Sequence, residues 1–380
     1  MAPAAGPSPF TLCLAGDVMT GRGVDQALPT PSKPELHESF VKNAADYVAF
    51  AESVHGPVQR RMPPAALWGD ALPLLAQVKP AATVVNLETS VTVSDDVWPG
   101  KGINYRMHPA NVGCLQAAHL DVCALANNHV LDYGRAGLLE TLDVLHRAGI
   151  RTAGAGRNLD EARQPARVVL ADGTALLVLA FGCEPSGIPA EWAAGPSRPG
   201  VWLFHDLSNR AADAVVAQLR AARRPGDVAV ASIHWGSNWG YEIDPDQVAF
   251  AHRLVEGGIG IVHGHSSHHV RPVEVYEDKL ILYGCGDLVN DYEGIPGHEE
   301  WRGDLGALYF VAATPPNGAL ASLQLAAMHM RRMRLERPMP ADAQLLAEIL
   351  TRISRPFGLR FTLSHAGLIA LERSNAAAPR

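Results

Sequence analysis

Short runs of apolar residues alternate with longer amphipathic segments along most of this sequence. The runs have the length of β-strands and are mostly aliphatic or β-branched. They cover residues 10–15, 83–87, 121–126, 168–170, 175–181, 228–233, 259–262, 280–283 and 308–312. Helical periodicity is found between them, in residues 134–148, 208–223 and 247–257. This alternation predicts an α/β fold with buried strands.

Paired strands replace this alternation from about residue 270. Residues 273–276 and 280–283 flank the polar sequence Glu-Asp-Lys, which suits the turn of a β-hairpin. Farther along, a Pro-Met-Pro break precedes a last predicted helix at residues 341–354. With no repeat and no clear linker, the sequence predicts a single domain over residues 1–380. Its core covers about 10–315, and a C-terminal helix and strand from 316–380 pack on that core.

Two long segments interrupt the pattern and are predicted to be binding loops or lids. Residues 29–68 contain scattered prolines and a predicted helix at 38–54. Residues 184–204 are rich in Pro, Gly, Ser and Trp.

Composition narrows the class of protein. The 380 residues are 47% hydrophobic, which is enough for a large core and excludes a largely disordered chain. The net charge of −7 does not suggest a nucleic-acid partner. Five cysteines without a CxxC pair argue against a disulfide framework and a cysteine zinc site. No signal peptide or membrane segment is evident, so we expect a cytoplasmic protein.

Polar residues follow six of the predicted strands, where open α/β sheets place their ligand sites. The sequences are Gly-Asp at 16–17, Asn-Leu-Glu at 86–88, Asn-Asn-His at 127–129, His-Trp-Gly at 234–236, His-Gly-His-Ser-Ser-His-His at 263–269 and Gly-Cys-Gly-Asp at 284–287. Carboxylate, amide and imidazole ligands without thiolates suit Mg²⁺, Mn²⁺, Fe or Zn²⁺. If these strands share one sheet edge, their side chains converge on one or two divalent metal ions.

Each sequence also has a structural interpretation when it is taken alone. Gly-Asp after a strand is a common turn or helix cap, and Asn-Asn-His can begin a helix. A single His after a strand is often packed in the core. The group at 263–269 is harder to explain in this way, because several neighbouring histidines after a Gly contribute little to a core.

At these residues the chain resembles the CapA family, which is linked to poly-γ-glutamate capsule synthesis, within the calcineurin-like metallophosphoesterase superfamily. The matching sequences are LAGDVM, VVNLETSVT, LANNHVLDYG, IHWGSNWGYE, GHSSHHVRPVEVY and LYGCGDLVND, in family order from residue 14 to 291. The resemblance implies a four-layer α-β-β-α sandwich of the metallophosphoesterase type with inserted loops.

The resemblance also implies roles for single residues. His129 is the expected general acid, assisted by Asp132, and Glu88 stands where the superfamily has a bridging carboxylate. Asp287 stands where the family often has Asn. The expected metal ligands are Asp17, Glu88, Asn128, His234, His265 and His268, with His263 and His269 as alternates.

Three positions depart from the superfamily pattern. Met19 replaces the His of Asp-x-His, Glu88 replaces an Asp, and Ser267 replaces the second His of Gly-His-x-His. These departures predict a poorer ligand set for one metal, with either two ions at altered spacing or one firmly bound ion.

The resemblance and the strand ends together predict a metal-dependent hydrolase acting on a small anionic or glutamyl substrate. Water activated by the metal would attack a phosphoester or a γ-glutamyl amide. Substrate contacts are expected from Arg22, Lys101, Arg106 and Trp235, although ordinary solvated charges and loop packing explain these residues equally well. The alternative is a non-catalytic polyglutamate-binding or capsule-assembly component with a structural metal site. The sequence gives no indication of oligomeric state.

Overall fold

The computed structural model describes residues 8–373 and contains two large mixed β-sheets. The first has ten strands. Its main path is β20 (Leu359–Leu363), β21 (Ile369–Arg373), β18 (Ala319–Arg331), β17 (Leu305–Thr314), β1 (Phe10–Val18), β2 (Ala82–Leu87), β5 (Val122–Ala124) and β6 (Arg151–Ala153). Two short strands join it at the side, β16 (Asp287–Val289) on β1 and β19 (Arg334–Glu336) on β18.

The second sheet has seven strands. Its order is β11 (Leu203–Phe204), β9 (Ala175–Cys183), β12 (Val228–His234), β13 (Ile261–His265), β15 (Lys279–Leu282) and β14 (Val273–Tyr276), with β8 (Ala166–Val169) paired to β9. Two-stranded ribbons join β3 (Ser90–Val91) to β4 (Arg106–Met107) and β7 (Ala155–Gly156) to β10 (Gly200–Val201). Together with the helices, these sheets confirm the α/β class.

A shared hydrophobic core lies between the two sheets. Alternation along β1 shows how the core is divided, because Leu12 and Leu14 enter this shared core whereas Cys13 and Ala15 pack on the other face. Val178 of β9 and Val230 of β12 enter the shared core from the second sheet.

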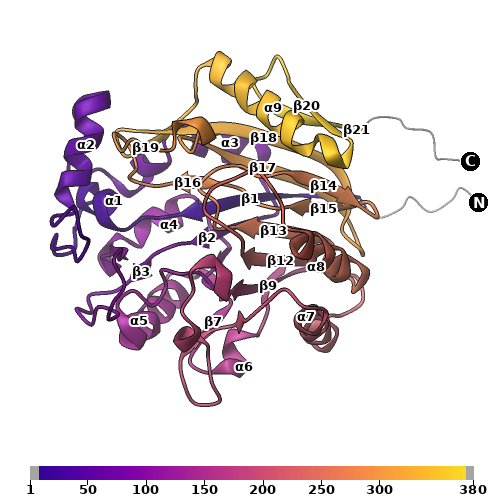
Figure 1. The fold of residues 1–380 in the computed structure, drawn as a ribbon. Coiled ribbons are helices and arrows are strands. Elements are labelled where there is room, and N and C mark those ends of the chain that lie inside the picture. Colours follow the sequence, from indigo (N-terminus) through magenta and orange to yellow (C-terminus); the bar gives the residue numbers. More distant parts are fainter. Residues whose placement is uncertain (1–7, 374–380) are drawn as a thin grey trace, which may run out of the picture.

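Helices cover the two outer faces (Figure 1). On the first sheet the outer core includes α1 (Arg22–Ala27), α2 (Ala45–His55), α3 (Ala71–Val78), α4 (Gly113–Ala117) and α5 (Gly134–Arg147). On the second sheet it includes α7 (Asn209–Ala222) and α8 (Pro245–Glu256), with the short α6 (Leu159–Ala162) beside them. The last helix, α9 (Pro340–Ser354), packs into the shared core beside β20 and β21.

Parallel pairing brings the strand ends with polar residues to one edge. β1 runs parallel to β2 and β16, and β12 runs parallel to β9 and β13. Gly16 allows β1 to approach β16 closely, because a Cβ at Gly16 would lie 1.9 Å from the carbonyl oxygen of Gly286. This contact sets Asp17 directly beside Asp287 in register.

The predicted elements agree with the structure in most places and differ in two. The helix predicted at 38–54 begins only at Ala45, because residues 35 and 43 form a β-bridge before it. Within 316–380, the described residues form four strands, β18 to β21, in addition to α9, where the sequence predicted one strand. The hairpin turn between β14 and β15 has positive φ at Glu277 (46°) and Asp278 (61°), as a type I′ turn requires.

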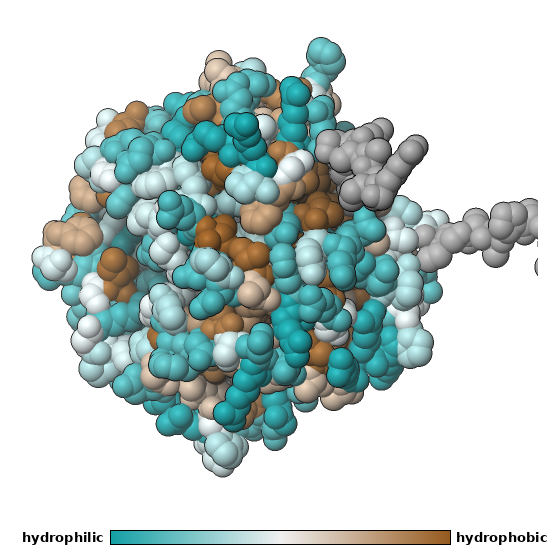
Figure 2. Space-filling view, turned by 45° about the vertical axis from the view of Figure 1, so that its right-hand side comes forward, coloured by the Kyte–Doolittle hydropathy of each residue, from teal (hydrophilic) through white to brown (hydrophobic). Residues whose placement is uncertain are grey.

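The face of the molecule in Figure 2 is mostly hydrophilic or intermediate, with apolar residues in small separate groups. Across residues 8–373, no helix combines the length and apolar character needed to cross a bilayer.

Candidate metal and catalytic site

Two groups of side chains at the shared strand edge are close enough to hold cations, and both contain Asp17. The first combines Asp17 with His234 and His265, and the second combines Asp17 with His268 and Asp287. Within each group the possible ligand atoms all lie within 4.8 Å of one another. The predicted convergence of Asp17, His234, His265 and His268 is therefore present in this structure, and Asp17 is the residue common to both groups.

The first group is buried and has a free nitrogen lone pair. His265 Nδ1 lies 3.0 Å from His234 Nδ1 and 3.9 Å from Asp17 Oδ1. Two atoms that share an ion at about 2.1 Å each can lie at most about 4.2 Å apart, so these separations suit a common cation. His234 Nε2 is buried without a hydrogen-bond partner.

A chain of hydrogen bonds fixes the tautomer of His265. His263 Nε2 lies 2.9 Å from the carbonyl oxygen of Ala15, which can only accept, so His263 donates there. Burial lowers the pKa of His263 to about 4, so this ring is neutral and its Nδ1 accepts from Ser232 at 3.1 Å. The Ser232 oxygen then accepts from His265 Nε2 at 3.0 Å, which leaves the lone pair of His265 on Nδ1, beside Asp17.

The second group lies nearer the surface. His268 Nδ1 is 3.1 Å from Asp287 Oδ1, and Asn290 donates to the other oxygen of Asp287 at 3.0 Å. Burial alone lowers the pKa of His268, but the Asp287 carboxylate outweighs it and the pKa is raised. His268 Nε2 also contacts the side-chain amide of Asn238 at 3.2 Å.

Three buried carboxyl groups meet at this edge, which favours a bound cation. Burial and then Asp287 raise the pKa of Asp17 to about 7. Burial, followed by Asp17 and Asp287, raises the pKa of Glu88 well above its usual value. Buried acids in such proximity must bind protons or cations, because burial penalises their charged forms. A divalent cation would replace those protons, so the donor set fits a metal.

Glu88 lies outside both metal-binding groups. Burial and then the nearby Asp17 raise the pKa of its carboxyl, which lies 3.9 Å from His129 Nε2. Asp17, and not Glu88, is the carboxylate common to the two groups in this arrangement. Metal ligation by Glu88 stays a prediction. Asn128, the remaining predicted ligand, has its side-chain oxygen buried without a hydrogen-bond partner, so this oxygen has a lone pair to offer a cation.

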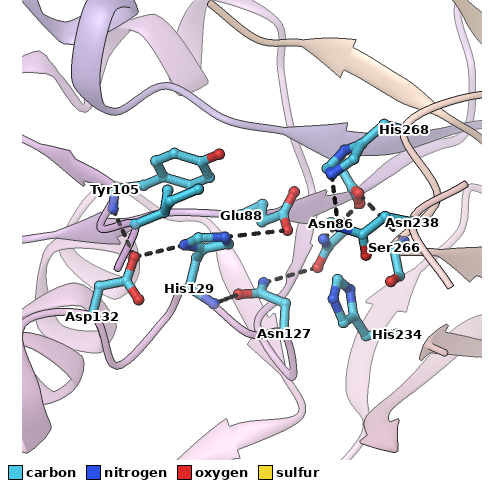
Figure 3. Close-up of polar contacts among 12 residues, drawn as sticks. Asn86, Glu88, Tyr105, Asn127, His129, Asp132, His234, Asn238, Ser266 and His268 are labelled. Atoms are coloured by element: carbon cyan, nitrogen blue, oxygen red, sulfur yellow. Dashed lines mark hydrogen bonds and ion pairs between the residues drawn. The ribbon is translucent and has the colours of Figure 1, made fainter. Parts of the chain in front are cut away.

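His129 and Asp132 form a hydrogen-bonded pair at the loop after β5. Asp132 Oδ2 lies 2.7 Å from His129 Nδ1 and also accepts from the backbone nitrogen of Tyr105 at 2.6 Å. Lys101 Nζ bonds to the other Asp132 oxygen at 2.6 Å and lies 3.0 Å from His129 Nδ1. Figure 3 shows the result, with one ring nitrogen of His129 directed at Asp132 and the other at Glu88.

The environment of His129 keeps the ring neutral in the metal-free protein. Burial and then the Lys101 ammonium lower its pKa to about 4, although Asp132 opposes this shift. Tyr105 stacks on the imidazole with ring centroids 3.9 Å apart and so fixes its plane. Lys101 binds Asp132 and the carbonyl oxygen of Ile103, and its contact with substrate stays a prediction.

Two asparagines connect the metal groups to His129, and the sequence interpretation gave them no role. Asn86 donates to Asp17 at 2.7 Å, and Asn127 donates to Asn86 at 2.9 Å. The Asn127 oxygen accepts from the backbone nitrogen of His129 at 3.1 Å. Both asparagines belong to the strand-end sequences already singled out, and only their spacing in three dimensions shows that they position Asp17 and His129.

The two predicted arginines are bound to protein carboxylates. Arg22 is 4% exposed and pairs with Glu38 at 2.8 Å and with both oxygens of Asp291. Arg106 bonds to Asp95 at 2.9 Å and to the carbonyl oxygen of Ser94. These contacts favour structural roles, and substrate binding by either arginine stays a prediction.

Trp235 does not contact a substrate site, which corrects the sequence prediction. Its side chain is fully buried in the core under α8, stacks on Tyr283 and donates to the Tyr283 carbonyl oxygen at 3.0 Å. Aromatic residues after strands serve both cores and pockets, and burial cannot be deduced from the local sequence alone. Trp239, four residues later, lines the main cavity instead.

The alternate histidines have internal partners. His263 is held by Ala15 and Ser232, as described above. His269 Nδ1 contacts the carbonyl oxygen of Val270 at 2.9 Å, and its Nε2 accepts from the backbone nitrogen of Gly240 at 3.1 Å. Two departures from the superfamily pattern are buried as well: Met19 in the core, and Ser267 bonded to the His269 carbonyl oxygen.

Relatives of this chain match it over different lengths. A probable polyglutamine synthesis accessory protein of Mycobacterium tuberculosis (strain H37Rv) is 49% identical over 362 residues, which cover 94% of both chains. The PGA biosynthesis protein CapA of Bacillus subtilis (strain 168) is 28% identical over 207 residues, 54% of this chain and 52% of that protein. The capsule biosynthesis protein CapA of Bacillus anthracis is 28% identical over 195 residues, 50% of this chain and 45% of that protein.

A solved structure from Thermus thermophilus, TT1561, aligns with a TM-score of 0.37 and 9% identity, covering 81% of this chain and 99% of that one. This similarity is too low to define the fold. The family model for the bacterial capsule synthesis protein PGA_cap matches residues 11–292, which include every strand-end sequence described above. The resemblance to CapA is thereby confirmed, and the chain belongs to the bacterial capsule synthesis protein (PGA_cap) family.

Proposed function

We propose that this chain is a metal-dependent hydrolase of the PGA_cap family, built as a four-layer metallophosphoesterase-type sandwich. The observation that carries the proposal is the sharing of buried Asp17 by two metal-binding groups, with His129 and Glu88 beside them. One or two divalent ions, such as Mn²⁺, Zn²⁺, Fe²⁺ or Mg²⁺, suit these ligands. A cation there would supply Lewis acidity and stabilise a developing oxyanion.

The residues of the chain itself would orient the reaction and move the proton. Asp132 accepts the Nδ1 proton of His129, so Nε2 of the neutral ring faces Glu88 and would take up a second proton there to form the imidazolium. His129 would deliver this proton to the leaving group. Asn86 and Asn127 fix the distance between Asp17 and His129 through consecutive hydrogen bonds. The bond cleaved is a phosphoester or a γ-glutamyl amide, and the second choice rests on the names of the relatives.

A metal-loading experiment with a parallel substrate screen tests the proposal. The purified chain is loaded with Mn²⁺, Zn²⁺, Fe²⁺ or Mg²⁺, its metal content is measured, and phosphoesters and γ-glutamyl amides are assayed. We expect metal uptake and turnover of one substrate class. The variant His129→Ala should retain its metal and lose turnover. Failure to bind metal under any loading condition would refute the proposal.

A non-catalytic role is the second candidate, and two observations favour it. The Mycobacterium tuberculosis relative is named an accessory protein, and the His of the superfamily's first metal sequence is replaced here by buried Met19. In that case, the loaded protein would bind oligo-γ-glutamate without hydrolysing any phosphoester or amide.

A further inference from the structure

A cavity of about 690 Å³ opens directly beside the second metal-binding group. His268 lines it and belongs to that group, while Asn290 lines it and donates to Asp287. Tyr105, also in the wall, stacks on His129. A ligand in this cavity therefore touches residues that belong to or contact the second metal group and the proposed acid.

The mouth of this cavity is apolar. Within the described part of the chain, seven large apolar side chains are exposed, and four of them line this one cavity. They are Phe40 (68% exposed), Val54 (52%), Ile103 (38%) and Ile295 (41%). Exposed apolar residues gathered in one place mark a binding surface, whereas scattered ones do not. Trp239, also in the wall, stacks on His298 with ring centroids 3.9 Å apart, which adds a flat aromatic surface.

The charges in the wall are unsuitable for a polyanion. Its two arginines already have carboxylate partners, Arg22 with Glu38 and Asp291, and Arg302 with Asp304 and Asp342. Glu293 and Glu299 also line the cavity. A polyglutamate chain carries one negative charge per residue, so these acids would repel it and no unpaired arginine would offset that repulsion.

We propose that this cavity binds an uncharged aromatic or other apolar portion of the substrate, whose single anionic or carbonyl end reaches the Asp17 groups. This assignment rests on the proposed function, because it assumes that the metal groups hold the reacting end. The volume lies within the usual range for small-molecule sites, roughly 300–1,000 Å³, so the apolar portion can be larger than one ring.

Calorimetric titration of the Mn²⁺-loaded full chain tests the assignment with three probes: 1-naphthylmethylphosphonate, methylphosphonate and tri-γ-glutamate. We expect the naphthyl probe to bind at least about tenfold more tightly than methylphosphonate, because it buries a ring system. Tri-γ-glutamate should bind more weakly than the naphthyl probe. Equal affinity for the two phosphonates, or tighter binding of tri-γ-glutamate, would overturn the assignment.

Two surface variants test whether the naphthyl group binds in this cavity. Ile295→Asp adds a charge at the mouth and should weaken naphthyl binding about tenfold, while methylphosphonate binding stays unchanged. Val169→Asp is the matched control, because Val169 is 65% exposed and does not line the cavity. It should leave both affinities unchanged.

The same titrations separate this assignment from the proposed function. Mn²⁺ uptake decides the metal centre independently of any probe. Naphthyl binding that depends on Ile295 supports the cavity assignment even if Mn²⁺ does not bind. Naphthyl binding insensitive to Ile295→Asp, or no naphthyl binding, overturns the cavity assignment even if Mn²⁺ binds.

Discussion

His263 donates its Nε2 proton to the carbonyl oxygen of Ala15, 2.9 Å away, and this contact determines which nitrogen of His265 faces Asp17. Ser232 lies between the two rings and couples their tautomers, because its hydroxyl donates to His263 Nδ1 and accepts from His265 Nε2. The tautomer of a metal ligand is commonly set by such a partner behind it. His263 and Ser232 therefore act as positioning residues for the proposed first metal group.

Replacing Ser232 by Ala should weaken metal binding without unfolding the protein. The variant removes the acceptor for His265 Nε2, so the lone pair of that ring is no longer confined to Nδ1. We expect affinity for Mn²⁺ or Zn²⁺ to fall about 10- to 100-fold in a chelator competition assay. Ser53→Ala is the control, because that exposed hydroxyl bonds only to the Phe50 carbonyl oxygen of its own helix. Unchanged affinity in Ser232→Ala would show that the chain does not select the tautomer.

The strands around the site could be predicted because each apolar run ends in a polar sequence, as at Ala82–Leu87 followed by Glu88. Parallel pairing then brings such ends together without further information. Which side chains lie close enough to share a metal ion, in contrast, depends on distances between strands of two different sheets. The sequence could not show that Asp17, rather than Glu88, lies within reach of both His265 and Asp287.

The other differences between the sequence predictions and the structure arise from the burial of side chains and the pairing of strands. Trp235 and Trp239 follow the same strand, yet one packs under α8 and the other lines the cavity, and only the tertiary fold separates them. β18 alternates weakly, with two adjacent buried alanines, so its 13 residues lack the aliphatic run that identifies a strand.

Arg22→Met should destabilise the protein, because it leaves Glu38 and Asp291 buried without their cation. Removing one partner of a buried ion pair costs about 3–5 kcal/mol. We expect this loss in the free energy of unfolding from urea denaturation, with Mn²⁺ uptake retained. Arg60→Met is the matched control, because its ion pair with Glu52 is exposed and such pairs contribute about 0–1 kcal/mol. A variant of normal stability that has lost only substrate affinity would instead establish the substrate-binding role predicted from the sequence.

Asp132→Asn should lower turnover while the metal stays bound. The amide cannot replace a carboxylate that accepts from His129 and Tyr105 and forms an ion pair with Lys101, so the Nδ1 proton of His129 loses its charged acceptor. We expect kcat to fall about 10²-fold or more, the usual contribution of a positioned acid–base group, with unchanged metal content. Asp143→Asn, on the exposed face of α5, should leave both quantities unaltered. Loss of metal together with activity would assign Asp132 to the metal groups and not to His129.

Glu88→Gln should stabilise the metal-free protein at alkaline pH. Burial raises the folded-state pKa of Glu88 well above its usual value, whereas the unfolded value is about 4.3. The stability associated with the protonated carboxyl is therefore complete below pH ~4 and is lost as pH rises through the folded pKa. The glutamine cannot ionise and avoids this loss. Each unit of pKa displacement corresponds to about 1.4 kcal/mol, which is roughly 2 °C in the melting temperature of a 380-residue domain.

Thermal melts of metal-free wild type and Glu88→Gln at pH 5 and pH 8 measure this effect. Burial lowers the pKa values of His234 and His265, so these histidines destabilise the folded protein as pH falls. Wild type and Glu88→Gln share this contribution, so it cancels in the comparison. The melting temperature of Glu88→Gln should therefore exceed that of wild type by about 2 °C or more at pH 8. This excess should shrink at pH 5 and should be absent from the exposed-site control Glu348→Gln. Saturating Mn²⁺ should reverse the order at pH 8, because the cation stabilises the ionised carboxylates that destabilise the metal-free wild type. If the excess does not depend on pH, Glu88 is not held protonated by its buried neighbours.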